Sequence, residues 1–434
     1  MTTHNKTHAA PAAPRLSIGL IDDAIEALAA LLRFEYPADA VLSHFFRDHK
    51  SLGARDRAFI AESVYAVLRR KRSLERICSA DGKVTPRRMF LAAMVTYLGF
   101  SQRQLADLFK SKELGWLASV KGQAETELSL AERAELPDWL AERLSKQWSE
   151  ADLLEVVRGL NQPAPLDLRV NTLKTSREAL LAQLKSEGID GEFTPYSPLG
   201  IRLKSKPFLA KHPLFLDGSF EVQDEGSQLL GQLLAPKRGE MVADFCAGAG
   251  GKTLLLGALM RSTGRLYAFD VSEKRLAKLK PRAARSGLSN IHPAAIANEH
   301  DQRIKRLAGK LDRVLVDAPC SGLGTLRRNP DLKWRQSEQS VLELTEKQAA
   351  ILAAAARLVK VGGRLVYATC SLLDEENQVV VDAFLAAHPE FKRLSSAEVL
   401  KKQGVDLDTG EDLHLLPHLH GTDGFYAAVL ERVA

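Results

Sequence analysis

The feature that most constrains the fold is an alternation of short apolar β-type runs with helical stretches after Pro236. The predicted strands are Met241–Phe245, Leu266–Phe269, Ile291–Ile296, Val314–Val316 and Leu365–Ala368. Strands that alternate with helices are typical of a parallel sheet, because each parallel pair needs a crossover connection. Residues 236–434 are therefore expected to form a doubly wound α/β domain, in which ligands bind at the carboxyl ends of the strands.

The part of the chain before this domain has two different patterns. From residue 15 to 148, apolar residues recur at helical spacing, as in Ile25, Leu28 and Leu32, which predicts an all-helical domain. Residues 149–235 are expected to form a linker and a small α+β segment. Its predicted elements are the strands Leu166–Val170 and Gly200–Leu203 and the helix Glu178–Glu187.

Composition and cysteine spacing exclude several classes of protein. No apolar run approaches the ~20 residues that a membrane-spanning helix needs, so no membrane segment is expected. Residues 1–14 are rich in Ala, Thr, His and Pro, which predicts a disordered tail and not a secretory signal. The cysteines Cys78, Cys246, Cys320 and Cys370 form no CxxC pair, so we expect neither a metal site nor a disulfide framework. We expect a cytoplasmic protein that is a monomer.

The charge of the chain favours contact with a polyanion. The formal net charge of the 434 residues is +6 and the pI is about 9.0. Basic residues gather at Arg69–Arg72, from Lys274 to Arg285, and at Arg327, Arg328, Lys333 and Arg335. Such clusters are typical of surfaces that follow nucleic-acid phosphates, but solvated helix faces carry the same pattern. The sequence leaves both interpretations open.

A glycine-rich loop follows the first predicted strand of the α/β domain. It consists of Cys246, Ala247, Gly248, Ala249, Gly250, Gly251, Lys252 and Thr253. A phosphate-binding P-loop would need a glycine where Cys246 stands, and a dinucleotide fingerprint would need one where Thr253 stands. The loop therefore favours a nucleoside-type cofactor without a pyrophosphate, for which close approach of the backbone suffices.

An acidic residue follows the second predicted strand. Asp270 comes directly after Leu266–Phe269, where its carboxylate could accept hydrogen bonds from the ribose hydroxyls of such a cofactor. The alternative is that Asp270 only caps a helix that begins near Ser272. Both roles are compatible with this position in the sequence.

Two cysteines follow later strands of the same predicted sheet. The first lies in Asp317–Ala318–Pro319–Cys320, and the second in Ala368–Thr369–Cys370–Ser371, ahead of Glu375–Glu376–Asn377. A single buried cysteine is often inert packing. Two cysteines at strand ends that face the same crevice are less readily explained by packing, and they predict a site that uses thiols.

Together these motifs resemble the RsmB/Sun branch of the RNA 5-methylcytosine methyltransferases, whose hallmarks are a Pro-Cys and a Thr-Cys motif. The resemblance runs from about Pro165 to the C-terminus and includes Leu168–Asn171, Val222–Asp224 and Asp423–Tyr426. Ala249 stands where the family commonly has a proline. The helical first part, with Asp56–Arg57 and Tyr65–Arg69, is similar to a NusB-type RNA-binding domain.

The resemblance implies a class I methyltransferase with a Rossmann-like sheet, S-adenosylmethionine as cofactor and RNA, in particular small-subunit (16S) ribosomal RNA, as partner. It implies that Cys370 attacks carbon 6 of a cytosine to form a covalent intermediate. The methyl group then joins carbon 5, and Cys320 assists release. Asp317 would bind the amidine edge of the base, and Lys252 would help to place the base or its phosphate.

The same resemblance assigns the residues that hold the cofactor. Asp270 would contact the ribose, and Asp317 would also touch the cofactor. The loop contributes Cys246, Ala247, Gly248, Ala249, Gly250, Gly251 and Lys252. The family's third-strand acid aligns with Asn298, which has Glu299 and Asp301 as neighbours, so any of the three could contact the adenine.

Two other functions fit part of this pattern. An RNA-binding or assembly protein of the same fold that has lost its activity would not need Cys320, Cys370, Asp317 and Lys252, which are all present. A DNA cytosine methyltransferase would use a Pro-Cys nucleophile. The Thr-Cys motif and the helical first domain favour RNA.

Overall fold

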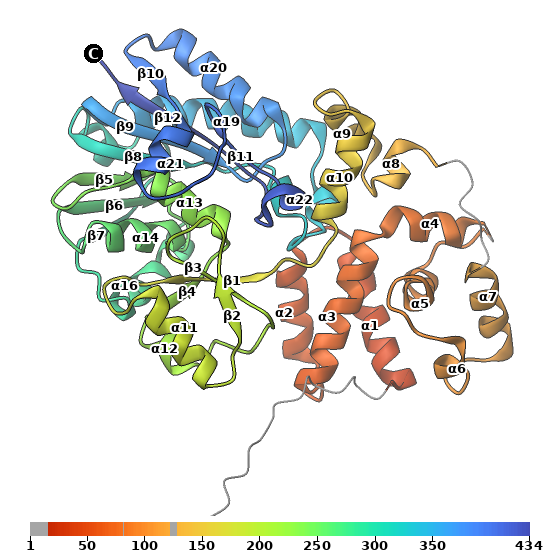
Figure 1. Cartoon of the computed structure of the whole chain (residues 1–434). Helices are drawn as coiled ribbons and strands as arrows, with labels where there is room; N and C mark the ends of the chain where they lie inside the picture. Colours follow the sequence, from red (N-terminus) through yellow and green to blue (C-terminus); the bar gives the residue numbers. More distant parts are fainter. Residues whose placement is uncertain (1–15, 81, 122–127) are drawn as a thin grey trace, which may run out of the picture. The chain divides into compact units, whose positions relative to one another are not determined.

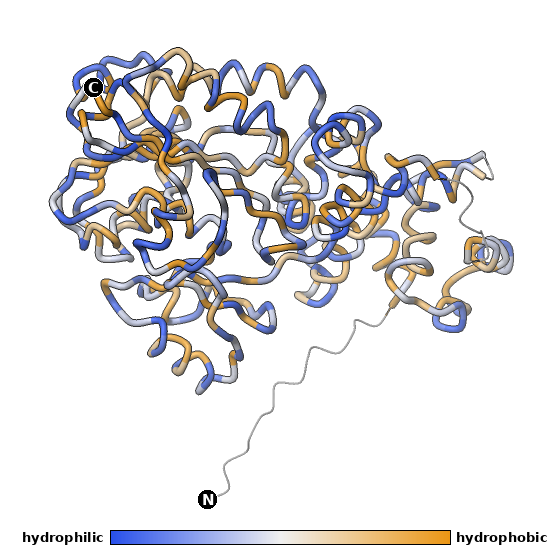
Figure 2. The backbone as a smooth tube through the Cα atoms, turned by 45° about the horizontal axis from the view of Figure 1, so that its top comes forward, coloured by the Kyte–Doolittle hydropathy of each residue, from blue (hydrophilic) through white to orange (hydrophobic). Residues whose placement is uncertain are grey.

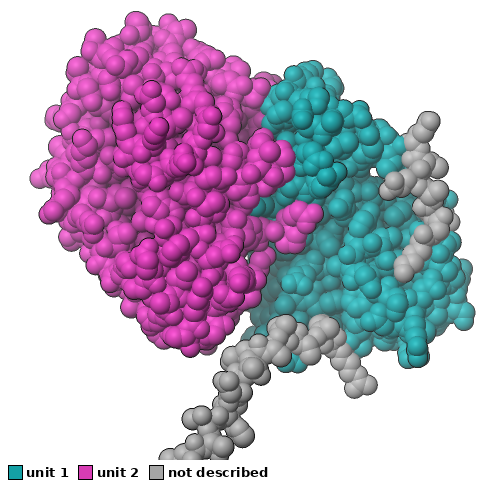
Figure 3. Space-filling view, in the orientation of Figure 1, with its two compact units in different colours: residues 1–161, 326–337 teal, residues 162–325, 338–434 magenta. Residues whose placement is uncertain are grey.

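The computed structural model describes residues 16–80, 82–121 and 128–434 (Figure 1). The predicted tail, residues 1–14, lies outside the described residues. The chain divides into two compact units, coloured separately in Figure 3. One comprises Met1–Asn161 with Leu326–Ser337, and the other comprises Gln162–Thr325 with Glu338–Ala434.

All regular elements in the described residues of the first unit are helices, as predicted. Its helices are α1 (Ile18–Leu31), α2 (Ala38–Asp48), α3 (Ala54–Arg69), α4 (Lys71–Ser79), α5 (Pro86–Thr96), α6 (Gln102–Leu105), α7 (Ser111–Lys121), α8 (Leu130–Arg133), α9 (Asp138–Leu144), α10 (Glu150–Leu160) and α18 (Leu332–Arg335). Leu28, Ile60 and Phe90 are fully buried in one core that joins α1, α3 and α5. The unit extends to Asn161, so it includes α10, which the sequence pattern had assigned to the linker.

The short segment Leu326–Ser337 belongs to this helical unit although the α/β domain surrounds it in sequence. Trp334 Nε1 donates a hydrogen bond of 2.9 Å to the carbonyl oxygen of Leu68, and Lys333 Nζ donates one of 3.1 Å to that of Arg69. These carbonyls end α3 and have no partner within the helix. The ammonium group also lies at the negative end of the helix dipole. The segment therefore caps α3 from far along the chain.

The same segment caps a second helix and buries part of one basic cluster. Pro37 precedes α2 and offers no side-chain cap, and Asp331 Oδ2 instead accepts from Ala38 N over 3.1 Å. Arg327 and Lys333 are buried, and burial lowers the pKa of Lys333 to about 7. Two members of the third basic cluster are thus packing residues of the helical unit and cannot follow phosphates at a surface.

The second unit begins with a small antiparallel sheet. Its elements are β1 (Leu166–Val170), α11 (Arg177–Ser186), β2 (Gly191–Phe193), β3 (Gly200–Leu203), α12 (Pro213–Leu216) and β4 (Phe220–Val222), with strand order β2-β3-β1-β4. The two predicted strands and the predicted helix are confirmed. Leu168, Leu184 and Phe220 are fully buried together, so α11 packs on one face of the sheet.

A larger sheet follows, with strand order β10-β12-β9-β8-β5-β6-β7 and β11 paired to β12. Its strands are β5 (Met241–Asp244), β6 (Arg265–Asp270), β7 (Ile291–Ala295), β8 (Leu311–Asp317), β9 (Val359–Thr369), β10 (Phe391–Leu394), β11 (Leu413–Leu415) and β12 (Phe425–Arg432). The first five are parallel and are the five predicted strands. The antiparallel β10, β11 and β12 extend the sheet beyond β9 and were not predicted.

Helices cover both faces of this sheet. They are α13 (Glu225–Leu234), α14 (Gly251–Leu259), α15 (Glu273–Leu276), α16 (Leu279–Arg285), α17 (Gln302–Lys305), α19 (Glu338–Ala356), α20 (Gln378–Ala387), α21 (Ser396–Lys402) and α22 (Pro417–His420), with the 3-10 turns η1 (Leu323–Thr325) and η2 (Asp374–Glu376). Val366 packs in the core that contains α13, and its neighbour Tyr367 packs in the core that contains α19. Successive strand residues point to opposite faces, so both faces are apolar. Figure 2 shows apolar residues along the central strands.

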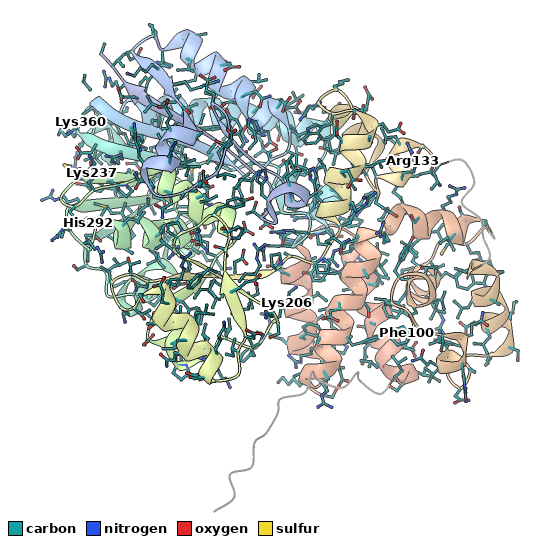
Figure 4. The ribbon with its side chains drawn as sticks, viewed as in Figure 1. Phe100, Arg133, Lys206, Lys237, His292 and Lys360 are labelled. Atoms are coloured by element: carbon teal, nitrogen blue, oxygen red, sulfur yellow. The ribbon has the colours of Figure 1, made fainter. Side chains whose placement is uncertain are left out.

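The two ends of the parallel strands differ in character. Figure 4 shows Lys237, His292 and Lys360 along one side of this unit, where β5, β7 and β9 begin. The glycine loop and both cysteines follow the opposite, carboxyl ends. Among the described residues, no helix is long and apolar enough to cross a membrane.

Candidate active site

A pocket of about 460 Å³ opens at the carboxyl ends of β5, β6 and β8 and takes in the residue after β9. This volume suits a ligand the size of a nucleoside. The predicted site residues that line it are Cys246, Ala247, Gly248, Ala249, Gly251, Lys252, Asp270, Asp317, Cys320 and Cys370. The structure thus brings together most of the side chains that the sequence singled out.

The glycine loop makes the sharp turn from β5 into α14. Gly250 has a φ of +88°, and a Cβ atom there would lie 2.2 Å from Leu279 Cδ1. Only glycine fits this backbone and this space. Gly250 does not line the pocket, and its contribution is to shape the turn that places Gly248 and Gly251 there.

Two arginines brace this loop from outside the pocket. Arg169 Nη1, on β1, donates to Gly251 O over 2.7 Å, and Arg282 Nη1, on α16, donates to Ala249 O over 2.6 Å. Arg282 Nη2 also donates to Glu221 Oε2 over 2.8 Å, which neutralises a buried carboxylate. Burial lowers the pKa of Arg169 to about 10. The small sheet therefore supports the glycine loop. The sequence signal was a charged residue within an apolar strand.

Asp270 joins the end of β6 to the glycine loop. Its carboxylate is almost fully buried and accepts from Gly248 N over 2.8 Å, Ser272 N over 2.7 Å and Arg275 Nη2 over 2.9 Å. The cap of α15 is the hydroxyl of Ser272, which accepts from Arg275 N. Helix capping therefore does not account for Asp270, whose position at the pocket wall favours the cofactor interpretation.

The structure separates the three candidates for the adenine contact. Glu299 lines the pocket, whereas Asn298 is exposed and its Oδ1 accepts from His300 N over 2.9 Å. Asp301 caps α17 by accepting from Arg303 N over 2.9 Å. Asn298 and Asp301 are thus engaged in local turns. This geometry favours Glu299 over the predicted Asn298.

Lys252 and Asp317 form an ion pair between α14 and β8. Lys252 Nζ lies 2.7 Å from Asp317 Oδ2, and the two side chains are 14% and 28% exposed. Burial alone would lower the pKa of Lys252, but Asp317, followed by Cys370 and Asp244, raises it overall. Lys252 is therefore a fixed positive charge at the wall of the pocket.

Asp244 lies at the end of β5 beneath this ion pair. Its Oδ2 accepts from Thr253 Oγ1 over 2.7 Å, whereas its buried Oδ1 has no hydrogen-bond partner. Burial raises the pKa of Asp244 to about 7, and the charge of Asp317 adds to this effect. A proton on the carboxyl group is thus favoured up to neutral pH.

Cys320 and Cys370 converge in the pocket as predicted. Their Sγ atoms lie 3.4 Å apart. The hydrogen bond with Cys370 is the largest cause that raises the pKa of the Cys320 thiol, followed by burial and the charges of Cys370 and Glu376. Cys320 therefore keeps its proton, and its sulfur lies within hydrogen-bond distance of Cys370 Sγ. Burial also raises the pKa of Cys246, which predicts an unreactive thiol.

Several residues of the pocket wall were not predicted as site residues. They include Gln223, Ser227, Asp244, Lys347 and Phe425. Phe425 begins β12, and Lys252 Nζ lies 5.6 Å from its ring centroid. Gln223 and Phe425 lie in motifs that the sequence comparison included, but a motif alone does not say which side chain turns inward. Lys347 lies on α19, in a stretch without any motif.

Two family profiles and a curated relative all relate this chain to ribosomal RNA methyltransferases. The family profile described as 16S rRNA methyltransferase RsmB/F matches residues 231–431, and that of a ferredoxin-like domain of RsmF/B-like methyltransferases matches residues 136–208. The probable ribosomal RNA small subunit methyltransferase B of Synechocystis sp. is 35% identical, over 91% of this chain and 95% of its own.

Solved structures agree with these matches. The crystal structure of PH0851 superposes with a TM-score of 0.79 and 28% identity, over 96% of this chain and 100% of its own. The structure of a methyltransferase homolog protein from Pyrococcus horikoshii superposes with a TM-score of 0.61 and 29% identity, over 71% of this chain and 100% of its own. These likenesses confirm the predicted Rossmann-like methyltransferase fold.

Proposed function

The chain belongs to the RsmB/F family of 16S rRNA methyltransferases, and from this membership we propose that it methylates carbon 5 of a cytosine in small-subunit ribosomal RNA. The methyl donor of the family is S-adenosylmethionine. The observation that carries the proposal is the pair of thiols 3.4 Å apart beside the Lys252–Asp317 ion pair. A methyltransferase that acts on a more nucleophilic atom would not need two thiols.

The chemistry of cytosine explains why thiols are needed. Carbon 5 of the ring is a poor nucleophile, and addition of a thiolate at carbon 6 makes it electron-rich. In the release step a base takes the proton from carbon 5, the electrons of that bond restore the double bond between carbons 5 and 6, and the sulfur leaves as a thiolate. A thiolate is suited to both steps because it is a good nucleophile and a good leaving group.

The surroundings of the two cysteines favour different roles. The positive charge of Lys252 faces Cys370, which is among the groups that raise the pKa of Lys252, whereas the raised pKa of Cys320 keeps its proton in place. We assign the attack on carbon 6 to Cys370 and assistance in release to Cys320. Asp317, held by Lys252, would accept a hydrogen bond from the amidine edge of the base and favour its protonated, electron-poor form.

The other half of the pocket fits the cofactor. Asp270 offers a buried carboxylate to ribose hydroxyls, and Arg275, which now contacts it, is 57% exposed and free to turn away. The backbone of Gly248 and Gly251 can closely approach the amino-acid part of S-adenosylmethionine. The carboxylate of Glu299 would accept a hydrogen bond from the amino group of the adenine. When bound, S-adenosylmethionine supplies an electrophilic methyl group.

The target base must leave its stack to enter such a pocket, so unpaired RNA is the natural substrate. Lys274, Lys278 and Lys280 are exposed beside the glycine loop and would neutralise phosphates near the target. We further propose that the protein acts as a monomer in the cytoplasm and uses no metal.

Transfer of a tritiated methyl group to an in vitro transcript of 16S rRNA tests this function, with DNA of the same sequence as a control. The full-length protein should label the RNA only. Cys320→Ala should trap methylated RNA in a covalent band on a denaturing gel, which depends on S-adenosylmethionine and shifts after nuclease treatment. Cys370→Ala should give neither label nor band.

Other results of this experiment would favour a different nucleophile or a different function. A band from Cys370→Ala but not from Cys320→Ala would move the nucleophile to the end of β8. Equal labelling of DNA would favour a DNA methyltransferase. A folded protein that binds the cofactor and the RNA but transfers nothing would point to an assembly role.

A further inference from the structure

The two loops that carry the cysteines share one buried carboxylate, that of Glu376. Each cysteine is followed by a serine, and the hydroxyl oxygens of Ser321 and Ser371 lie 3.1 Å apart, just as the two sulfur atoms lie 3.4 Å apart. The loops therefore run side by side in matched pairs. Glu376 lies in η2 and is fully buried.

Glu376 accepts hydrogen bonds from both loops at once. Its Oε1 accepts from Ser321 N over 2.8 Å, and its Oε2 accepts from Ser321 Oγ over 2.5 Å and from Ser371 Oγ. Gln348 Nε2, on α19, donates to Oε1 over 2.9 Å. Four donors thus converge on two oxygens, which is the arrangement that an ionised carboxylate prefers.

The backbone of Glu376 is itself fixed. Its carbonyl oxygen accepts from the hydroxyl of Tyr367, on β9, over 2.7 Å. The next residue, Asn377, accepts from Thr369 Oγ1 over 2.5 Å and donates to Ser371 O over 3.3 Å. The carboxylate is therefore anchored to the sheet, and the cysteine loops are attached to it.

This placement has two consequences for the thiols. The β8 loop cannot move relative to the β9 loop unless a charged hydrogen bond inside the protein is broken. The negative charge of Glu376 also acts on Cys320, where it helps to keep the thiol protonated. Both effects fall more on Cys320 than on Cys370, since two of the bonds come from Ser321.

We propose that Glu376 is the positioning residue that holds Cys320 at its working distance from Cys370, and that it is needed for release of the product. The inference rests on the proposed function, because it concerns the step in which Cys320 assists. Glu376 is not among the residues that line the pocket, so it acts through the two loops.

Glu376→Gln in the full-length protein tests this proposal with the 16S rRNA transcript. The substitution keeps the size of the side chain but replaces one acceptor by a donor opposite Ser321 or Ser371. The covalent adduct per methyl group transferred should rise about tenfold, and turnover should fall by a similar factor, as expected for a misplaced group. The dissociation constant of S-adenosylmethionine should stay within about twofold.

Two further variants make the test specific. Glu346→Gln removes a carboxylate from an exposed position on α19, the helix that carries Gln348, and should behave like the natural protein. Ser371→Ala removes one donor and little volume. It should raise the adduct ratio in the same direction, and it replaces Glu376→Gln if that variant does not fold.

The ratio of adduct to turnover separates positioning from folding. An equal fall of adduct and turnover in both variants, with each shown to be folded by circular dichroism, would overturn the inference. A natural ratio in both variants, while Cys320→Ala does accumulate adduct, would also overturn it and leave the proposed function intact. Absence of adduct from Cys320→Ala itself would reject the proposed function and this inference with it.

Discussion

The two halves of the pocket are built by different means. The half that we propose for the cofactor, called the cofactor half below, consists mainly of backbone, shaped by Gly250 and braced by Arg169 and Arg282, with Asp270 as a buried acid. The cysteine half consists of side chains that hold one another, with Cys320 and Cys370 in contact. Changes in the first half should therefore alter cofactor affinity, and changes in the second should alter chemistry at unchanged affinity.

Lys252 lies where the halves meet and gives the largest expected effect. Lys252→Met would leave Asp317 half-buried without its positive partner, and Cys370 without a stabilising charge. Methyl transfer to the 16S rRNA transcript should fall about 10²- to 10³-fold, the usual loss when a fixed charge is removed from a reacting site. The cofactor dissociation constant, measured by calorimetry, should change by less than about twofold.

A control and a contrary result define this prediction. Lys237→Met removes an exposed lysine at the opposite end of the strands and should leave both quantities unchanged. If cofactor binding by Lys252→Met instead weakens more than transfer does, then Lys252 belongs to the cofactor half.

Asp270→Ala addresses the cofactor half and should have a moderate effect. Removal of a charged hydrogen-bonding partner from buried donors costs about 1–3 kcal/mol, so calorimetry should show cofactor binding weakened by this amount. RNA binding should barely change. Glu273→Ala, in the exposed first turn of α15, is the matched control. An unchanged dissociation constant for Asp270→Ala would leave it with a purely structural role at the end of β6.

The division between what the sequence predicted and what it missed follows the range of the contacts. The parallel strands, the glycine loop and the convergence of Cys320 with Cys370 were predicted, because apolar periodicity and parallel topology determine them. The antiparallel β12 was missed although it lies between β9 and β10, since a final strand carries no local sign of where it inserts.

Contacts between distant parts of the sequence could not be predicted. Trp334 and Lys333 cap α3, which lies more than 260 positions earlier, so their basic surroundings suggested an exposed surface instead. Glu376 was noticed only as part of a motif, because its role depends on two loops that meet in space. For the adenine contact, the alignment favoured Asn298, but turn geometry directs Glu299 into the pocket.

The last prediction concerns Asp244, which lies between the halves and should have the smallest effect on activity. All four tryptophans of the chain lie in the helical unit, namely Trp116, Trp139, Trp148 and Trp334. Their fluorescence would therefore report on that unit and not on the α/β unit, which contains Asp244. Hydrogen exchange of the β5 amides, measured by mass spectrometry from pH 5 to pH 8, is the suitable probe of local stability here.

The sign of the effect follows from the direction of the pKa shift. The pKa of Asp244 is about 7 in the folded protein and ordinarily about 4, so the folded state holds an extra proton between these values. The stabilisation that this extra proton gives to the folded state is complete below about pH 4 and is lost as the pH rises through 7. Asp244→Asn cannot lose a proton, so its opening free energy should exceed that of the natural protein by a margin that grows by about 2–3 kcal/mol from pH 5 to 7 and then levels off. Asp406→Asn, at an exposed position, should show no such trend. A margin that does not change with pH would mean that Asp244 is ionised in the folded protein, held by Lys252, and would assign it to the cysteine half.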